Sequence, residues 1–368
     1  MIPVFKPSYG EEELEALRQV LASGWAGLGP KTREFEQKFA RFLGTGRAVG
    51  LNSGTAALHL AFKLMNVEGG EVITTPLTFV STNHAILYNR AVPVFADIEE
   101  STLNVDINEV EKLITPRTRA VVAVHFGGHP CRMNPLMELS RKHGFKVVED
   151  CAHACGSEYR GQKAGTIGDA GCFSFHAVKN LACGEGGALT LKNEELDSRA
   201  RKLRWLGISK DTFSRAGSRS YSWQYDVDEL GYKAHMNDIP AVIGLVQLAK
   251  LEALNDKRRR IAHFYNQAFA DLDWLETPPA GEGIKNATHN YVIKIPSRDR
   301  FIDYLGSKGI SVGMHYYPNH LFSAYKEYRR ALPVAEAVWK RLATLPLYPD
   351  LTTDEQNLIV ETVRSFQP

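Results

Sequence analysis

Short apolar runs alternate with amphipathic runs from about residue 46 to residue 191. Seven of the apolar runs have the length and composition of strands: RAVGLN, EVITTP, VPVFAD, RAVVAVHF, FKVVED, AGCFSFH and GGALTL. Between several of them, apolar residues recur at helical spacing, over 55–66, 81–89, 107–114 and 133–144. Strands this apolar are typical of burial on both faces. The pattern therefore predicts an α/β domain whose mainly parallel, seven-stranded sheet is covered by helices on both sides.

The chain on either side of this alternation has a different pattern. The elements predicted there are helices at 11–24 and 31–44, a further helix after 191, a polar and aromatic loop at 208–235, and a long helix near 238–270. The remainder, with NYVIKI, FIDYLGSKG and TDEQNLIVETVRSF, predicts a smaller α+β domain. We place the boundary near residue 250. Residues 1–250 would then hold the N-terminal helices and the large domain, and 251–368 the small domain.

The charge balance argues against nucleic acid or a membrane surface as a partner. The 368 residues include 44 basic and 42 acidic side chains, so no global field recruits a polyanion. A basic run at 257–260 lies in the long predicted helix, where a solvated helix face explains it; a contact with substrate phosphates is the alternative. We find no helix-turn-helix with a basic face, which opposes a DNA-binding regulator.

The cysteines and the N-terminus favour the cytoplasm. Five cysteines lie in the middle of the chain, an odd count without the spacing of a disulfide framework. CAHAC at 151–155 does not match a zinc pattern and has no second cluster, so we expect no metal and interpret these cysteines as small buried residues. The first residues lack a signal-peptide layout, and no apolar run is long enough to cross a bilayer.

The segment NSGTAAL at 52–58 runs from a predicted strand into a predicted helix. Free backbone N–H groups at a helix N-terminus bind anions, and a glycine lets a phosphate approach closely. An ordinary helix cap explains the same residues, because serine and threonine commonly precede helices. The segment is therefore a candidate phosphate site only in combination with others.

Asp150 ends the strongly apolar strand in FKVVEDCAHA. In open α/β sheets, ligands gather beyond the carboxyl ends of the strands, so a carboxylate there is either a structural cap or the partner of a cation. Pyridoxal phosphate (PLP) needs such a partner, because its protonated ring nitrogen makes the cofactor an electron sink. His153 follows closely and is either a contact of the cofactor's phenolic oxygen or a core histidine.

Lys179 follows a short predicted strand in SFHAVKNLACGEGG. Ser174 and His176 share one face of that strand if the strand period holds. A lysine at a water-poor strand end has a lowered pKa and can form a Schiff base, although most lysines at such places are exposed and inert. The lysine precedes the glycines, whereas a P-loop requires the reverse order, which argues against an ATPase or kinase.

In chain order these segments supply a phosphate site, an acid at a strand end and a lysine after a later strand. That order resembles the fold-type-I PLP transferases of the aspartate aminotransferase superfamily. The details go further. SGTAAL, TPLTFVST, VVEDCAHA, SFHAVKN-GEGG and GYKAHMNDIPAVIGLVQL resemble the DegT-type sugar aminotransferases, as does the N-terminal pattern GW-GLGP-EFE-FA-LG. The resemblance covers nearly the whole chain.

The resemblance implies PLP as cofactor and pyridoxamine 5'-phosphate as intermediate. Lys179 would form the Schiff base and carry the proton between the substrate carbon and the cofactor carbon. Asp150 would pair with the pyridine nitrogen. His153 would contact the phenolic oxygen, where many relatives carry glutamine.

The resemblance also assigns contacts around the cofactor's ring and phosphate. Gly54 and Thr55 would bind the phosphate, with Ser174 adding a hydroxyl. Phe79 would stack on the ring; packing in the core is its alternative. Asn237 would reach the phosphate of the other subunit, which implies a homodimer with shared active sites.

Substrate contacts are expected in MHYYPNHLF, where relatives place residues near the sugar. Four residues stand at those positions, and an aromatic cluster explains them equally well: His315, Tyr316, Tyr317 and His320. We take His315, Tyr317 and His320 as the substrate candidates. The loop before the long helix departs from relatives, which often have arginine at His235 and asparagine at Lys233. This loop could wall a sugar-nucleotide pocket or pack at the dimer interface.

The reaction implied is transfer of the amino group of L-glutamate to a nucleotide-linked keto-deoxysugar, giving an amino sugar for surface polysaccharide or secondary-metabolite biosynthesis. Three alternatives stay open: a PLP-dependent sugar dehydratase, an aminotransferase acting on a non-nucleotide ketone, and a regulatory or non-catalytic assembly protein. Related dehydratases carry histidine at the lysine position, so Lys179 opposes the first.

Overall fold

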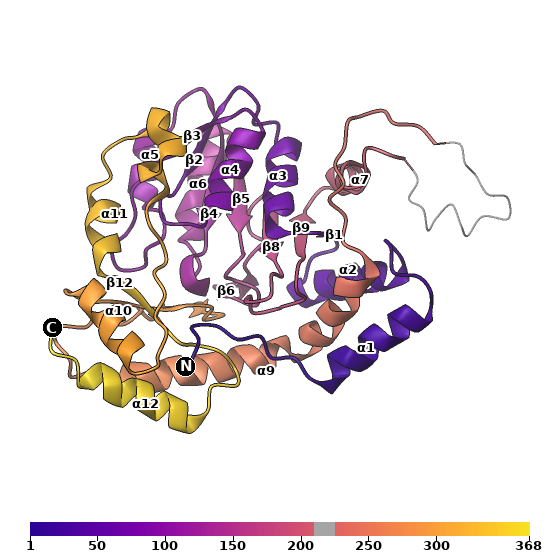
Figure 1. Cartoon of the computed structure of the whole chain (residues 1–368). Coiled ribbons are helices and arrows are strands. Elements are labelled where there is room, and N and C mark those ends of the chain that lie inside the picture. Colours follow the sequence, from indigo (N-terminus) through magenta and orange to yellow (C-terminus); the bar gives the residue numbers. More distant parts are fainter. Residues whose placement is uncertain (210–224) are drawn as a thin grey trace.

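The computed structural model describes residues 1–209 and 225–368 and is shown in Figure 1. Its α-helices are α1 (Glu11–Ala22), α2 (Pro30–Leu43), α3 (Gly54–Leu64), α4 (Val80–Tyr88), α5 (Ile107–Leu113), α6 (Met133–His143), α7 (Glu194–Leu203), α9 (Asp238–Ala268), α10 (Arg298–Ser307), α11 (Pro333–Val338) and α12 (Thr353–Arg364). The 3-10 helices are η1 (Phe126–Gly128), η2 (Asn319–Leu321), η3 (Ser323–Tyr328) and η4 (Trp339–Arg341). The strands are β1 (Ala48–Leu51), β2 (Glu71–Thr74), β3 (Val92–Phe95), β4 (Thr118–Val124), β5 (Lys146–Asp150), β6 (Glu158–Tyr159), β7 (Gln162–Lys163), β8 (Ala170–Ser174), β9 (Gly187–Leu191), β10 (Ile284–Lys285), β11 (Tyr291–Lys294) and β12 (Leu342–Leu345).

A seven-stranded sheet forms the centre of the large domain, in the order β1-β9-β8-β5-β4-β2-β3. The pairs β8-β5, β5-β4, β4-β2 and β2-β3 are parallel, whereas β9 is antiparallel to both of its neighbours. The prediction of an α/β fold with a mainly parallel seven-stranded sheet is confirmed. Six of the strands lie within the apolar runs from which they were predicted, and β4 begins one residue before its run, at Thr118.

Helices cover both faces of the sheet because each strand alternates apolar side chains between two buried layers. On one face, α3, α4 and α7 pack on side chains such as Val122 and Val148. On the other face, α5 and α6 pack on Val121 and Val147, and α2 and α9 cover the region of β8 and β9. Successive residues of β5 therefore point to opposite layers.

Local sequence signals set the helix ends near the sheet. Ser53 caps α3, since its side chain accepts a hydrogen bond from the Ala56 N–H. Pro30 occupies the first turn of α2, and Gly44 ends that helix in the left-handed conformation, with φ of 73°. These signals fix where the chain leaves each helix and returns to the sheet.

The C-terminal part has a separate core, in which α10, α12 and the end of α9 pack around β11 and β12. Figure 1 shows α9 running beneath both parts, with the two termini on the side of the C-terminal part. Residue 250 lies inside α9, so a boundary placed there would divide one continuous helix. Across 1–209 and 225–368, no helix combines the length and hydropathy needed to span a membrane.

Candidate active site

A cavity of about 480 Å³ opens beyond the carboxyl ends of β5 and β8. The predicted residues that line it are Gly54, Thr55, Phe79, Asp150, His153, Ser174, Lys179 and His315. Segments distant in the sequence meet there, because parallel strands end at the same edge of a sheet. The fold therefore brings together the residues that were predicted to contact the cofactor within one subunit.

The N-terminus of α3 forms one end of the cavity. The first N–H groups of a helix have no partner within it and carry a partial positive charge. The Ser53 hydroxyl oxygen accepts the hydrogen bond of the Ala56 N–H. The N–H groups of Gly54 and Thr55 therefore stay available for a ligand. A Cβ atom at Gly54 would lie 2.8 Å from the Cβ atom of Ser174, so only glycine fits here. This end suits an anion.

Asp150 also lines the cavity and is buried on the face of the sheet covered by α3 and α4. Its carboxylate accepts hydrogen bonds from the Thr82 hydroxyl at 2.7 Å and from the Ala152 N–H at 3.1 Å. Burial outweighs these bonds and raises the pKa of Asp150. A cationic ligand group beside Asp150 would supply the missing charge.

Lys179 projects its amine into the same cavity. Burial lowers the pKa of Lys179 to about 8, and the negative charge of Asp150 opposes that shift. The backbone N–H of Lys179 donates to the carbonyl of His176 at 2.8 Å, which forms the tight turn after β8. An amine with this pKa exists in both protonation states near neutral pH, as proton transfer requires.

His153 is held by two hydrogen bonds at the cavity wall. The backbone N–H of Gly127 donates to His153 Nδ1 at 3.3 Å, and His153 Nε2 lies 3.0 Å from the Tyr316 hydroxyl. Because Nδ1 accepts, the neutral ring carries its hydrogen on Nε2 and donates to Tyr316. Burial and the charge of Lys179 keep the pKa of His153 well below its usual value, so the ring is neutral.

Phe79 stands at the mouth of the cavity and is 60% exposed, so it does not pack in the core. It precedes α4, and its ring centroid lies 6.4 Å from that of Tyr316. An exposed aromatic ring beside a cavity is placed to cover a planar ligand.

Two cavity residues, Phe5 and His289, carried no signal in the sequence. Phe5 belongs to the N-terminal segment, and His289 precedes β11; their rings stack with centroids 5.2 Å apart. Tyr316 also lines the cavity, although its neighbour Tyr317 was the candidate. These residues converge only through long-range packing, so neither periodicity nor a local motif identifies them.

Three predicted residues lie elsewhere. Tyr317 packs against Phe322 and Trp339 with centroid separations of 5.0 and 4.9 Å, and His320 is buried with its Nε2 3.1 Å from Glu336. Asn237 caps α9 by accepting the Ile239 N–H, and it is not part of the cavity lining. Its contact with a second subunit stays a prediction.

The loop predicted at 208–235 belongs only partly to the described structure. Residues 210–224 lie outside the described residues, so the proposal that they wall a sugar-nucleotide pocket has no structural account here. The two positions that depart from relatives are described: the Lys233 amine lies 3.6 Å from the centroid of the Trp205 ring, and His235 packs edge-on against the same ring.

A second cavity, of about 500 Å³, lies between α2 and α7 and contains several cations. Arg201 and Arg204 both form ion pairs with Glu36, and other lining cations also have carboxylate partners. No predicted site residue lines this cavity. We therefore take the cavity that contains Lys179 as the candidate active site.

The residues of this candidate site fit PLP. The α3 N-terminus offers unpaired N–H groups for a phosphate, at a glycine where a side chain would collide with Ser174. Asp150 offers a buried carboxylate with a raised pKa for a ring cation, and Lys179 offers an amine near neutrality for the aldehyde. A phosphate, a protonated ring nitrogen and an aldehyde are the three reactive features of this cofactor.

Comparison with known proteins gives the same result. Residues 7–364 match the family model described as the DegT/DnrJ/EryC1/StrS aminotransferase family. The spore coat polysaccharide biosynthesis protein SpsC of Bacillus subtilis is 42% identical over 377 residues, which cover 99% of this chain and 97% of SpsC.

Solved structures of sugar aminotransferases superpose over nearly the full length. The sugar aminotransferase CalS13 of Micromonospora echinospora is 35% identical with a TM-score of 0.93, covering 100% of both chains. The PMP form of Spr1654 from Streptococcus pneumoniae, described as a putative sugar aminotransferase, is 32% identical with a TM-score of 0.93, covering 98% of each chain.

Proposed function

Since the chain belongs to the DegT/DnrJ/EryC1/StrS aminotransferase family, whose solved relatives are PLP-dependent sugar aminotransferases, we propose that it aminates a nucleotide-linked keto-deoxysugar with L-glutamate as the donor. The observation that carries this proposal is the placement of Lys179 and Asp150 in one cavity with the N-terminus of α3. The match to SpsC favours a role in making amino sugars for a surface polysaccharide.

Each residue has a distinct task in this proposal. PLP, when bound, supplies an electron sink that acidifies the hydrogen on the carbon bearing the amino group. The Lys179 Nζ atom would remove that proton and hold it until it is returned. The Asp150 carboxylate would keep positive charge on the ring nitrogen. The N–H groups of Gly54 and Thr55 anchor the phosphate.

We propose in addition that the active enzyme is a homodimer in which Asn237 reaches the phosphate in the partner's site. Asn237 lies at the N-terminus of α9 and is partly exposed, as such a contact requires. Mixing two inactive variants, Lys179→Ala and Asn237→Ala, would restore part of the activity through hybrid dimers if the sites are shared.

The proposal is tested with a panel of ketosugars, nucleotide-linked and free, incubated with L-glutamate and assayed for 2-oxoglutarate and amino sugar. We expect amination of a nucleotide-linked member and a loss of about 10²–10⁴-fold in Lys179→Ala, because general acid–base catalysis is removed. Lys142→Ala, an exposed lysine on α6, is the control. Dehydration without amination would support the dehydratase instead. A protein that binds PLP but aminates only non-nucleotide ketones would overturn the substrate class.

A further inference from the structure

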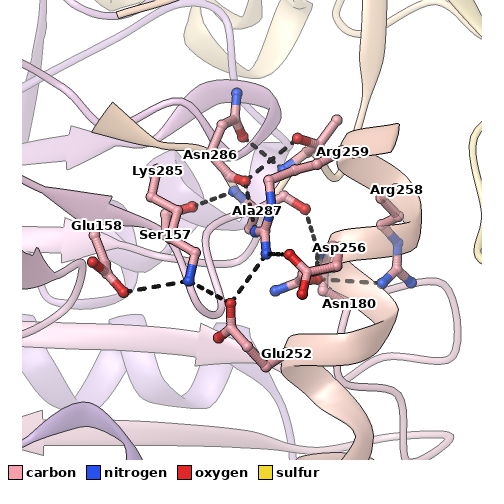
Figure 2. Close-up of polar contacts among 12 residues, drawn as sticks. Ser157, Glu158, Asn180, Glu252, Asp256, Arg258, Arg259, Lys285, Asn286 and Ala287 are labelled. Atoms are coloured by element: carbon pink, nitrogen blue, oxygen red, sulfur yellow. Dashed lines mark hydrogen bonds and ion pairs between the residues drawn. The ribbon is translucent and has the colours of Figure 1, made fainter. Parts of the chain in front are cut away.

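Asn180, the residue after the catalytic lysine, is fixed by three hydrogen bonds. Its Nδ2 group donates to Asn255 Oδ1 on α9 at 2.7 Å and to the backbone carbonyl of Ala287 at 2.8 Å. Figure 2 shows Asn180 between α9 and the segment that carries Ala287. A backbone carbonyl can only accept, so the orientation of the Asn180 amide is determined, and Asn180 Oδ1 points the other way.

Asn180 Oδ1 lies 3.0 Å from Nδ1 of His289. An amide oxygen can only accept, so His289 Nδ1 carries the hydrogen. Burial, with the charge of Lys179 as the next cause, keeps the pKa of His289 well below its usual value, and a neutral ring has one N–H. His289 Nε2 is therefore a bare lone pair. Across residues 1–209 and 225–368, no group forms a hydrogen bond with it.

His289 lines the active-site cavity, and its ring is parallel to that of Phe5 within 1°. His153, whose ring centroid is 4.4 Å away, has the opposite tautomer, with hydrogen on Nε2 donated to Tyr316. The Tyr316 hydroxyl thus accepts from His153 and keeps its own hydrogen for another acceptor. Two neighbouring histidines consequently give the cavity a hydrogen-bond donor at Tyr316 and an acceptor at His289.

The reacting group that needs an acceptor is the primary amine. We propose that Asn180 is a positioning residue that holds the hydrogen of His289 on Nδ1, so that Nε2 accepts a hydrogen bond from the amino group of the amine donor. This inference rests on the proposed aminotransferase function for its ligand. The other tautomer would direct an N–H group at the substrate's N–H hydrogens, and two donors repel each other.

The tautomer is measured by long-range ¹H–¹⁵N NMR of the PLP-loaded enzyme labelled with [¹⁵N]histidine. The chain has 12 histidines, and the His289 signals are assigned by their loss in His289→Phe. We expect hydrogen on Nδ1 in the unsubstituted enzyme and a mixture of tautomers in Asn180→Ala. Hydrogen on Nε2 in the unsubstituted enzyme would overturn the proposal even if Asn180→Ala does not fold, and so would an unchanged tautomer in a folded Asn180→Ala.

The matched control is Asn89→Ala. Asn89 is also buried and donates to two backbone carbonyls, those of His59 and Ala85, but it is not part of the cavity lining. It should lose stability as Asn180→Ala does and leave the His289 tautomer unchanged. If the His289 tautomer also changed in Asn89→Ala, lost stability alone would explain the effect, and the role of Asn180 would be contradicted.

The kinetic test compares the two substrates. We expect His289→Phe to raise KM for L-glutamate about 10- to 100-fold, as loss of a hydrogen bond to a charged group implies, and to change KM for the ketosugar much less. The cofactor's absorbance should persist, since the phenyl ring can keep the stacking on Phe5. An equal rise in both KM values would contradict the assignment. If no ketosugar is aminated, the proposed function fails, but the NMR result still decides the tautomer.

Discussion

Glu149 and Asp150 are adjacent acids at the end of β5, and both are buried, at 0% and 4% exposure. Because successive strand residues point to opposite faces, Glu149 faces the layer of α5 and α6, and Asp150 faces the cavity. Their pKa values shift in opposite directions. Burial raises the pKa of Asp150, whereas the hydrogen bonds to Glu149 outweigh its burial and lower its pKa.

The number of donors explains the difference. Glu149 accepts from the N–H groups of Gly165, Ile167 and Gly168 at 2.7–2.9 Å and from His125 Nε2 at 3.0 Å. A carboxylate has about four lone-pair sites, so Glu149 is saturated. Among residues 1–209 and 225–368, Asp150 accepts from only two donors, so it retains capacity for a cation. One acid is therefore structural, and its neighbour is available for chemistry.

This saturation also explains why a cluster of possible metal ligands does not suggest a metal site. His125, Glu149 and Cys151 offer atoms within 4.8 Å of one another. The His125 ring, however, accepts the Cys131 N–H on Nδ1 and donates from Nε2 to Glu149, so neither nitrogen is free. Burial raises the pKa of the Cys151 thiol well above its usual value, which disfavours the thiolate that a metal needs.

The largest expected effect is the loss of activity in the variant Asp150→Asn. Removing one partner of a buried charge pair costs about 3–5 kcal/mol, which corresponds to a loss of activity on the order of 10²–10⁴-fold. The stability of the cofactor-free protein should stay the same or rise, because an uncompensated buried charge is removed. Urea unfolding and the amination rate measure the two effects. A large loss of stability in the cofactor-free variant would show that Asp150 is structural as well.

Glu149→Gln should lower the stability of the protein and leave cofactor binding intact, the reverse of Asp150→Asn. The new amide directs N–H hydrogens at backbone donors, so we expect a loss of about 3–5 kcal/mol in the free energy of unfolding. The folded fraction should bind PLP normally, as judged by its absorbance. A variant of full stability with impaired cofactor binding would refute the division of roles. Exposed Glu138→Gln on α6 is the matched control.

The pH dependence of the cofactor-free protein should separate the two acids by sign. The pKa of Glu149 is lowered from 4.5, so the stability it contributes is present above that pH and is lost as the pH falls through its folded-state pKa. The pKa of Asp150 is raised from 3.8, so its contribution is present at low pH and is lost as the pH rises through its folded-state pKa.

Unfolding by urea between about pH 3 and 7 measures these contributions, each pKa unit being worth about 1.4 kcal/mol. Glu149→Gln should weaken the loss of stability in acid, and Asp150→Asn should weaken the loss on the alkaline side. If the free energy of unfolding changed with pH in the same way in both variants, the opposite pKa shifts of Glu149 and Asp150 would be contradicted.

The smallest effect is expected for Thr82→Val, which removes one donor to Asp150 and keeps the shape of the side chain. A hydrogen bond to a charged group is worth about 1.5–3 kcal/mol, so activity should fall about 10- to 100-fold at most. Ser140→Ala removes a buried hydroxyl that donates to Phe145 and lies away from the cavity, and it provides the control. Equal activity in both variants would show that Asp150 does not depend on Thr82.

Much of the fold and part of the site could be predicted from the chain. Strand and helix periods gave the seven strands and their covering helices, because burial on both faces leaves continuous apolar runs. Gly54, Asp150 and Lys179 were predicted together because ligands gather at the carboxyl ends of strands, and all three line one cavity. Tyr317 and His320 were candidates that pack outside the cavity lining, since a local motif does not show which of two adjacent tyrosines faces inward.

The sequence alone determined which residue types stand at the ends of the strands, since periodicity and turn residues are local properties. Only the tertiary structure decided which of two adjacent acids would be saturated by hydrogen bonds and which would keep lone pairs for a ligand. It also brought Phe5, His289 and Tyr316 to one cavity. Donor counts, burial and tautomers depend on groups that are distant in the chain, and folding brings those groups into contact.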